Sequence, residues 1–288
     1  MFSIKNGRKR RFIAGAAALV GTAAAVGAFA STGTASAATH PAATHPAAAD
    51  HAPKPTIVLE HGAFADASSW DGVINDLRRD GYPVVAAANP LRSPASDAAS
   101  LRALLNHIKG PVILVGHSYG GSVISAAAYG DPQVKALVYV AAFLPAPGET
   151  ALQLTNLYPG STLPAALDPV PLTNADGSTG TDLYIQQDKF RHQFAADVPA
   201  NQAALMAQTQ RPIAEAALAE KATVAAWETI PSWDIITTKD LNIPAAAQEF
   251  MAERAHAHTT KVAASHSVAV SHPDLVADVI EKAARATR

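Results

Sequence analysis

The sequence predicts an α/β protein built on a doubly wound, mainly parallel sheet of about six strands. Short apolar runs alternate with helix-like patterns over residues 56–140, and the alternation resumes after residue 231. Residues 145–225 interrupt it. This interruption predicts a small, largely helical cap, inserted after the strand that ends near Ala141 and placed over the sheet edge where ligands bind.

The first 37 residues have the pattern of a signal peptide. A basic stretch at 5–11 precedes an apolar run at 12–30, and a small-x-small triplet predicts cleavage after Ala37. The apolar run is mostly alanine, glycine and valine, so a retained membrane anchor is the less favoured alternative. We therefore expect a secreted, extracellular protein. A pair of arginines leaves open whether export is general secretory or twin-arginine.

Residues 38–55 are rich in proline, alanine and histidine, which predicts an extended linker before a domain at 56–288. The signal peptide holds five basic residues and no acid. Its charge of +5 leaves −7 on the rest of a chain whose total formal charge is −2. This negative balance argues against nucleic acid as a partner. The chain has no cysteine, which excludes disulfides and thiolate catalysis.

The first half of the domain alternates four strand patterns with three helix patterns. The strands are short apolar runs, and the helices place apolar residues on one face. Glycine and proline mark the turns. In chain order we expect a strand at 56–59, a helix at 68–79, a strand at 82–87, a helix at 96–108, a strand at 112–115, a helix at 120–129 and a strand at 134–140.

The second half begins with the cap. Its segment 159–180 is rich in proline, glycine, asparagine and threonine, whereas 184–194 and 198–220 are helix-like. The sheet pattern then returns, with a strand at 233–237, a helix at 245–258, a strand at 261–264 and a closing helix at 274–286. Candidate substrate-pocket residues are the aromatic residues Phe64, Phe143, Phe190 and Phe194. Packing within the cap is the alternative role for Phe190 and Phe194.

The central motif is Gly116-His117-Ser118-Tyr119-Gly120, which follows a buried strand pattern and precedes an alanine-rich helix pattern. G-x-S-x-G in this setting is typical of a nucleophile elbow. The tight turn strains the serine backbone, and the positions two before and two after it must be small. A glycine- and serine-rich loop without chemistry is the alternative.

A serine nucleophile needs a base and an acid that orients the base. In such a sheet these follow in the order serine, acid, histidine, each after a strand. Ser118, Asp240 and His266 satisfy that order. Because the carboxyl ends of parallel strands share one edge, the three side chains are expected to converge.

Other acids and histidines compete for these roles. Asp234 lies within a strand pattern, and Glu149 fits only an alternative position at the start of the cap. His61 and His117 each belong to a backbone turn and are expected to support their loops.

Two backbone N–H groups are expected to stabilise an oxyanion. One belongs to Tyr119, directly after the nucleophile, and the other to Ala63, where Gly62 allows close approach of the backbone. No phosphate-binding glycine motif and no metal-ligand cluster occurs at this site. We therefore expect neither a cofactor nor a metal.

These motifs resemble the α/β-hydrolase superfamily, and within it the branch of small plant methylesterases, hydroxynitrile lyases and bacterial esterases. The resemblance extends from about Thr56 to the C-terminus and rests on 61–64 with Ser69-Trp70, 116–121, 237–240 with Ile243-Pro244, and Ser265-His266. It implies a triad of Ser118, Asp240 and His266 and an oxyanion hole of Ala63 and Tyr119.

The same branch suggests two activities. The lyases have a threonine after the first-turn histidine and a lysine after the catalytic histidine, where this chain has Gly62 and Ser267. Cleavage of a small-molecule carboxylic ester by a secreted serine esterase is therefore the favoured hypothesis. A lyase on the same triad and a non-catalytic ligand-binding protein of this fold are the alternatives.

Overall fold

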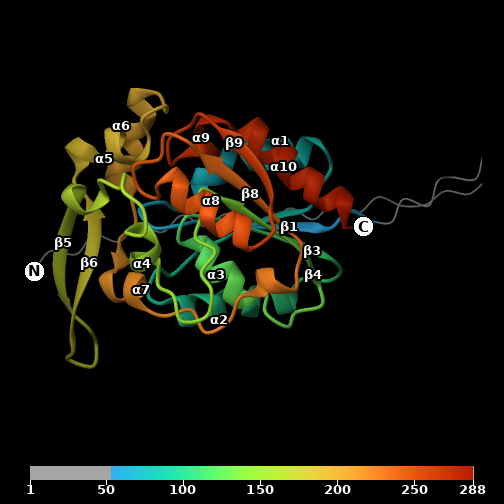
Figure 1. Ribbon diagram of the computed structural model, residues 1–288, viewed down its shortest axis with the longest axis horizontal. Coiled ribbons are helices and arrows are strands. Elements are labelled where there is room, and N and C mark those ends of the chain that lie inside the picture. Colours follow the sequence, from blue (N-terminus) through green and yellow to red (C-terminus); the bar gives the residue numbers. More distant parts are fainter. Residues whose placement is uncertain (1–52, 288) are drawn as a thin grey trace, which may run out of the picture. The chain divides into compact units, whose positions relative to one another are not determined.

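The computed structural model describes residues 53–287, and its centre is a six-stranded sheet in the order β2-β1-β3-β4-β8-β9 (Figure 1). The strands are β1 (Thr56–Glu60), β2 (Val84–Ala87), β3 (Val112–His117), β4 (Val134–Val140), β8 (Ser232–Thr237) and β9 (His258–Val262). Each neighbouring pair is parallel, which confirms the predicted sheet. The predicted signal peptide at 1–37 and linker residues 38–52 lie outside the described residues.

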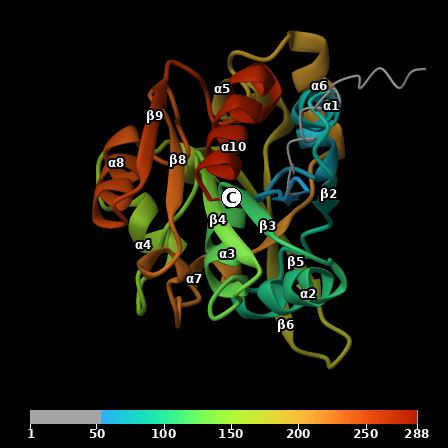
Figure 2. The ribbon, with the colours of Figure 1, turned by 90° about the vertical axis from the view of Figure 1, so that its right-hand side faces the viewer.

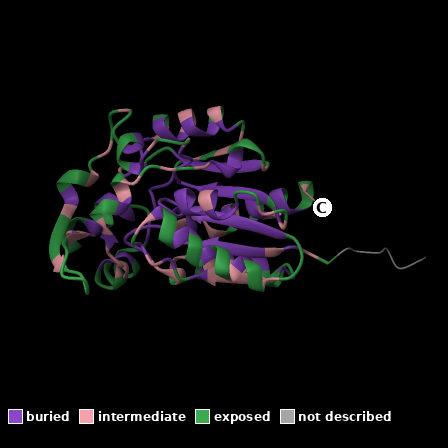
Figure 3. Ribbon diagram, turned by 90° about the horizontal axis from the view of Figure 1, so that it is seen from below, coloured by how far each residue is buried: buried purple, intermediate pink, exposed green. Residues whose placement is uncertain are grey.

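Helices cover both faces of this sheet (Figure 2). One face packs against α1 (Asp71–Arg79), α9 (Val268–Ser271) and α10 (Pro273–Ala286), and the other against α2 (Pro94–His107), α3 (Gly120–Ala127) and α8 (Ala245–Arg254). Side chains alternate along a strand, so Ile113 and Val115 face α1 and α10 while Leu114 faces α2 and α3. The central strands are buried (Figure 3). Burial on both faces accounts for the continuous apolar run of β3.

The cap is inserted between β4 and β8 and lies to the left in Figure 1. It contains the helices α4 (Ala151–Thr155), α5 (Gln187–Phe194), α6 (Ala200–Thr209) and α7 (Glu215–Ala219), with a three-stranded sheet of β5 (Leu167–Thr173), β6 (Thr179–Ile185) and β7 (Ile213–Ala214). The sequence pattern predicted helices in the regions of α5, α6 and α7, but neither α4 nor this antiparallel sheet.

Three predicted boundaries in the cap are corrected. Tyr184 and Ile185, predicted as helix, close strand β6. The helix predicted over 198–220 is two helices, because Pro212 cannot continue a helix and β7 follows it directly. The segment 159–180, for which no helix or strand was predicted, contains β5 and the start of β6, with the hairpin turn at 174–178.

The last strand is also shifted from its predicted position. The helix expected to reach His258 ends at Arg254, and His256 takes a positive φ of 49° in the turn that follows. Strand β9 then starts at His258 and ends at Val262, instead of spanning 261–264. It is an edge strand with largely solvent-facing polar residues, so its apolar signal is weak. No helix among residues 53–287 is long and apolar enough to cross a membrane.

Candidate active site

Ser118 occupies the predicted sharp turn between β3 and α3, with φ at 54°. A non-glycine residue in this left-handed region is strained, so tertiary packing must hold it there. The packing leaves no room for side chains around it. A Cβ at Gly116 would lie 2.7 Å from the carbonyl oxygen of Gly120, and one at Gly120 would lie 2.6 Å from that of Glu60. The small residues of the motif are therefore required by close backbone contact.

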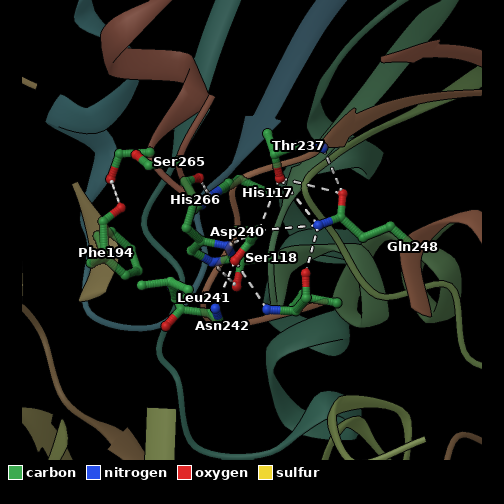
Figure 4. Close-up of polar contacts among 12 residues, drawn as sticks. His117, Ser118, Phe194, Thr237, Asp240, Leu241, Asn242, Gln248, Ser265 and His266 are labelled. Atoms are coloured by element: carbon green, nitrogen blue, oxygen red, sulfur yellow. Dashed lines mark hydrogen bonds and ion pairs between the residues drawn. The ribbon is translucent and has the colours of Figure 1, made fainter. Parts of the chain in front are cut away.

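Ser118, His266 and Asp240 form one continuous chain of hydrogen bonds (Figure 4). Ser118 Oγ lies 2.8 Å from His266 Nε2, and His266 Nδ1 lies 2.7 Å from Asp240 Oδ2. The three residues follow β3, β9 and β8, whose carboxyl ends share one edge of the sheet. The structure thus brings together the three side chains that sequence order had selected. The arrangement fits the tautomer with the proton on Nδ1, which leaves Nε2 free to accept the serine proton.

The Asp240 carboxylate is saturated with donors. Oδ1 accepts the backbone N–H groups of Asn242 (2.7 Å) and Ile243 (3.0 Å). Besides His266, Oδ2 accepts from the Thr237 hydroxyl (2.9 Å) and from Gln248 Nε2 (3.1 Å). These donors fix the carboxylate in the orientation that aligns the imidazole. Thr237 and Gln248 were not predicted as partners of Asp240, and the contact of Gln248 depends on how α8 packs against the loop.

The two predicted oxyanion donors face the same pocket. Ala63 and Tyr119 both line it beside Ser118. Within residues 53–287 neither backbone N–H donates to a protein acceptor, whereas the neighbouring N–H of Phe64 is bound to the carbonyl of Arg211 at 3.0 Å. The Ala63 and Tyr119 groups are therefore available to a substrate oxygen, and that of Phe64 is not.

A buried acidic cluster holds the side chain of Tyr119. Its hydroxyl donates to Asp97 Oδ2 at 2.8 Å, and the same carboxylate accepts the backbone N–H of Arg92. Glu60 lies nearby, and burial, followed by repulsion from Asp97, raises the pKa of Glu60 to about 8. Burial likewise raises the pKa of Tyr119, so its phenol stays protonated and can donate. No sequence signal pointed to this cluster, because its members come from separate elements.

The two other histidines near the site support loops, as expected from their places in turns. His117 Nε2 contacts the backbone carbonyl of His266 at 3.0 Å, and burial lowers the pKa of His117 to about 3, so its ring is neutral. His61 Nδ1 donates to the carbonyl of Gly62, and its Nε2 accepts the N–H of Asn89. Burial lowers the pKa of His61 as well. Neither ring is bonded to the Ser118 hydroxyl.

The two alternative acids lie elsewhere. Asp234 is fully buried in the middle of β8, and burial raises the pKa of its carboxyl well above the usual range. Neither of its oxygens has a hydrogen-bond partner among the described residues. Glu149 forms a bidentate ion pair with Arg254, at 2.6 and 2.9 Å. Asp240 is the carboxylate that contacts the histidine ring.

An apolar pocket of about 580 Å³ lies over Ser118 and beneath the cap. No charged Asp, Glu, Lys or Arg side chain lines it in the described part of the chain. Its wall consists of Ala63, Phe64, Ser118, Tyr119, Phe143, Leu152, Thr155, Leu163, Pro164, Leu167, Leu218, Asn242, Ile243 and His266.

The four predicted pocket aromatics divide into two pairs. Phe64 and Phe143 line the pocket as predicted. Phe190 and Phe194 lie behind the wall, so their predicted role is corrected. Both are at most 1% exposed, their rings pack 5.1 Å apart, and the ring of Phe194 lies 5.0 Å from that of His266.

The two positions that distinguish esterases from lyases also have defined environments. A Cβ at Gly62 would lie 2.6 Å from Ser118 Cβ and 2.7 Å from the carbonyl oxygen of His117. The Ser267 hydroxyl donates to the carbonyl of Phe194 at 2.8 Å and does not line the pocket. Neither position presents a polar group to a bound substrate. Among residues 53–287 no group of three or more histidine or acidic side chains is arranged to hold a metal ion.

Known proteins match almost the whole domain. The model of the Alpha/beta hydrolase family matches residues 57–279. Alpha/beta hydrolase nvfD of Aspergillus novofumigatus is 27% identical over 254 residues, which cover 80% of this chain and 97% of that protein. The pyrethroid hydrolase of Sphingobium wenxiniae is 28% identical over 252 residues, which cover 78% of this chain and 85% of that protein.

A solved structure shows the same fold. The crystal structure of polyneuridine aldehyde esterase superposes with a TM-score of 0.71 at 18% sequence identity, and the match covers 80% of this chain and 98% of that chain. This likeness shows that the two chains share a fold. Since the family match spans the sheet, the cap and all three hydrogen-bonded residues, the chain belongs to the Alpha/beta hydrolase family.

Proposed function

We propose that this chain is a serine hydrolase that cleaves carboxylic esters through an acyl-enzyme intermediate. The observation that supports this most directly is the chain of hydrogen bonds from Ser118 through His266 to Asp240, at 2.8 and 2.7 Å. Ser118 lines an apolar pocket beside the backbone N–H groups of Ala63 and Tyr119, which donate to no protein acceptor among the described residues. The relatives described above are named hydrolases, and the structural neighbour is named an esterase.

The geometry suggests a role for each group. His266 Nε2 removes the proton of Ser118 as the hydroxyl attacks the ester carbonyl. Asp240 stabilises the resulting imidazolium, and the N–H groups of Ala63 and Tyr119 hold the negative oxygen of the tetrahedral intermediate. The imidazolium then protonates the departing alcohol. Water, activated by the same histidine, hydrolyses the acyl-enzyme and restores Ser118.

The environment of two residues favours ester hydrolysis over cyanohydrin cleavage. The hydroxynitrile lyases of the resembling branch place a threonine and a lysine at the positions of Gly62 and Ser267. Here the glycine backbone is packed against Ser118, and the Ser267 hydroxyl is bonded to the cap. Among the described residues, position 267 therefore offers no lysine ammonium to stabilise a leaving cyanide, so release of cyanide from a cyanohydrin is not expected.

We also propose that the domain acts outside the cell. The support is the pattern of residues 1–37, with its basic start, apolar run and predicted cleavage after Ala37. Sequencing the N-terminus of protein recovered from the culture medium tests this. Ala38 is the expected first residue, and full-length protein retained in the cells would contradict export.

The catalytic proposal is tested by turnover of 4-nitrophenyl butyrate. Ser118→Ala is expected to lower kcat roughly a million-fold, because the nucleophile is removed. Ser100→Ala, at an exposed position on α2, serves as the matched control and should retain activity. Turnover by Ser118→Ala at the rate of the unchanged protein would contradict a serine mechanism.

A further inference from the structure

The cap is hydrogen-bonded to the loop that bears His266. Asp197, between α5 and α6, accepts the backbone N–H of Ser265 at 3.0 Å and also the Ser265 hydroxyl. The hydroxyl of Ser271 donates to the same carboxylate at 3.1 Å. One cap carboxylate therefore holds the residue directly before His266 and the end of the short helix that follows it.

The residue after His266 is bound to the cap as well. The backbone N–H and the hydroxyl of Ser267 both donate to the carbonyl of Phe194, at 3.0 and 2.8 Å. The Phe194 ring in turn lies 5.0 Å from the His266 ring. Figure 4 shows Phe194 and Ser265 beside His266, on the side away from Thr237 and Gln248. The cap thus contacts the histidine loop on both sides of the imidazole.

Apart from the imidazole of His266, the core holds this loop by fewer hydrogen bonds than the cap does. Strand β9 ends at Val262, and Ser265 to Ser267 have no strand partner. From the core, the imidazole of His266 is bound by Ser118 and Asp240. Apart from the imidazole, the loop receives only the contact of His117 with the carbonyl of His266 and the hydrogen bond from the N–H of Lys239 to the carbonyl of Ala264, among the described residues. The carboxylate at position 197 supplies three of the remaining restraints, and a shift of the loop would displace Nε2 from Ser118.

The hydrogen bonds that Asp197 accepts favour the ionised form of its carboxylate. Partial burial alone would raise the pKa of Asp197, but the hydrogen bonds from Ser265 and Ser271 outweigh it and lower the pKa below its usual range. Hydrogen bonds to an ionised acceptor are the stronger kind. The side chain of Asp197 is 27% exposed, and His272 Nδ1 lies 3.9 Å from it. The Asp197 carboxylate is therefore partly exposed, with the titratable imidazole of His272 beside it.

We propose that Asp197 is a positioning residue for the reaction: it fixes Ser265, and through it the imidazole of His266, in line with Ser118. The inference rests on the proposed hydrolase function. It assigns the cap a second task beyond forming the pocket wall, because the same insertion also aligns the base. Asp197 does not line the pocket, so its effect should fall on the chemical step and not on substrate binding.

The test compares Asp197→Ala, Asp197→Asn and Ser265→Ala in the full domain. Asp197→Ala is expected to lower kcat for 4-nitrophenyl butyrate by about ten- to a hundredfold, as small misplacements of catalytic groups do, with KM within about twofold. Asp197→Asn should recover part of kcat, since the amide oxygen still accepts a hydrogen bond. Asp197→Ala combined with Ser265→Ala should be no slower than Asp197→Ala alone, because the Ser265 hydroxyl has already lost its partner when the carboxylate is removed. Asp188→Ala, at an exposed acid of α5, is the control.

A second readout separates this inference from the proposed function. The proton on His266 Nδ1 gives a downfield NMR signal that depends on the bond to Asp240 and not on ester turnover. It should broaden or shift in Asp197→Ala and persist in Asp188→Ala. Wild-type kcat and an unchanged signal in Asp197→Ala would overturn the inference. An inactive wild-type protein whose signal still responds to Asp197 would overturn the proposed function alone. If Asp197→Ala does not fold, the same criteria apply to Asp197→Asn and Ser265→Ala.

Discussion

The backbone of Ser118 is strained, and the packing of the surrounding residues holds it in this conformation. Its φ of 54° is costly for a residue with a side chain, by about 1–3 kcal/mol. Three glycines allow the backbone to close around it, since a Cβ at Gly62, Gly116 or Gly120 would lie 2.6 or 2.7 Å from the nearest atom. The glycines at 116 and 120 were predictable, because small residues at fixed spacing from a serine are a local signal. The contact of Gly62 with Ser118 was not, since Gly62 comes from another loop.

Glu60 provides a residue-level prediction about stability. The folded pKa of about 8 lies above the ordinary 4.5, so between these values the folded state holds a proton that the unfolded chain has lost. Its contribution is complete below pH 4.5 and declines as the pH rises to about 8. Glu60→Gln, which keeps the neutral form, should therefore gain stability relative to wild type over this interval, by at most about 5 kcal/mol.

Urea unfolding of both proteins at pH 5 and pH 8 measures this difference. Glu215→Gln removes an exposed carboxylate and is the matched control. If the difference in unfolding free energy between wild type and Glu60→Gln were equal at the two pH values, it would contradict the raised pKa of Glu60.

The candidate site was predictable at the residue level only in part. Ser118, Asp240 and His266 could be chosen because each follows a strand in the required order. The partners Gln248 and Asp97 could not, since each is one polar residue on a helix and its contact depends on how that helix packs. Phe190 and Phe194 were misassigned for a related reason, because an aromatic side chain in a cap can face the pocket or the cap interior.

At the level of elements, β8 and α8 form one unit around the Asp240 loop. Gln248, on α8, accepts the N–H of Thr237 at 3.0 Å and donates to the carbonyl of Ile243 at 2.8 Å. It also donates to Asp240 at 3.1 Å. Gln248 therefore connects the end of β8 at Thr237 to Ile243, just before α8, and binds the Asp240 carboxylate between them.

Removing this amide should weaken both fold and catalysis. Gln248→Leu keeps the approximate volume but leaves the buried N–H of Thr237 and the carbonyl of Ile243 without a partner. The expected loss of unfolding free energy is about 2–3 kcal/mol, together with a lower kcat. Gln208→Leu makes the same change at an exposed site on α6. Equal denaturation midpoints for Gln248→Leu and Gln208→Leu would count against this role.

The elements differed in how well sequence predicted them. The central strands were predictable, since burial on both faces leaves an apolar signature. The β5–β6 hairpin was not, because its residues are mostly exposed and its edge strand contains Pro169 and Pro171. Strand β9 was shifted because its polar residues face solvent at the sheet edge, where pairing, not hydrophobicity, defines the strand.

At the scale of the whole domain, loops at the sheet edge hold Ser118, Asp240 and His266, and these loops and the cap together line the pocket. The pocket wall is apolar, and its polar contributions come mainly from the site itself. Burying a charged group there without a partner is costly. The domain should therefore discriminate against charged acyl groups while accepting neutral ones of equal shape.

This is tested with two 4-nitrophenyl esters of nearly equal shape, the neutral 5,5-dimethylhexanoate and the cationic 4-(trimethylammonio)butanoate. We expect kcat/KM to be at least about tenfold higher for the neutral ester, because the cation loses its hydration without gaining a partner. Equal values, or a preference for the cation, would contradict an uncharged pocket.

The central claim is that Ser118 is the nucleophile, and covalent labelling tests it most directly. The domain is treated with a fluorophosphonate, and its intact mass and peptides are measured. We predict one adduct per chain, on Ser118, with none on Ser118→Ala and a much slower reaction in His266→Ala. Ester hydrolysis by a protein that forms no adduct, or an adduct on another residue, would contradict the account.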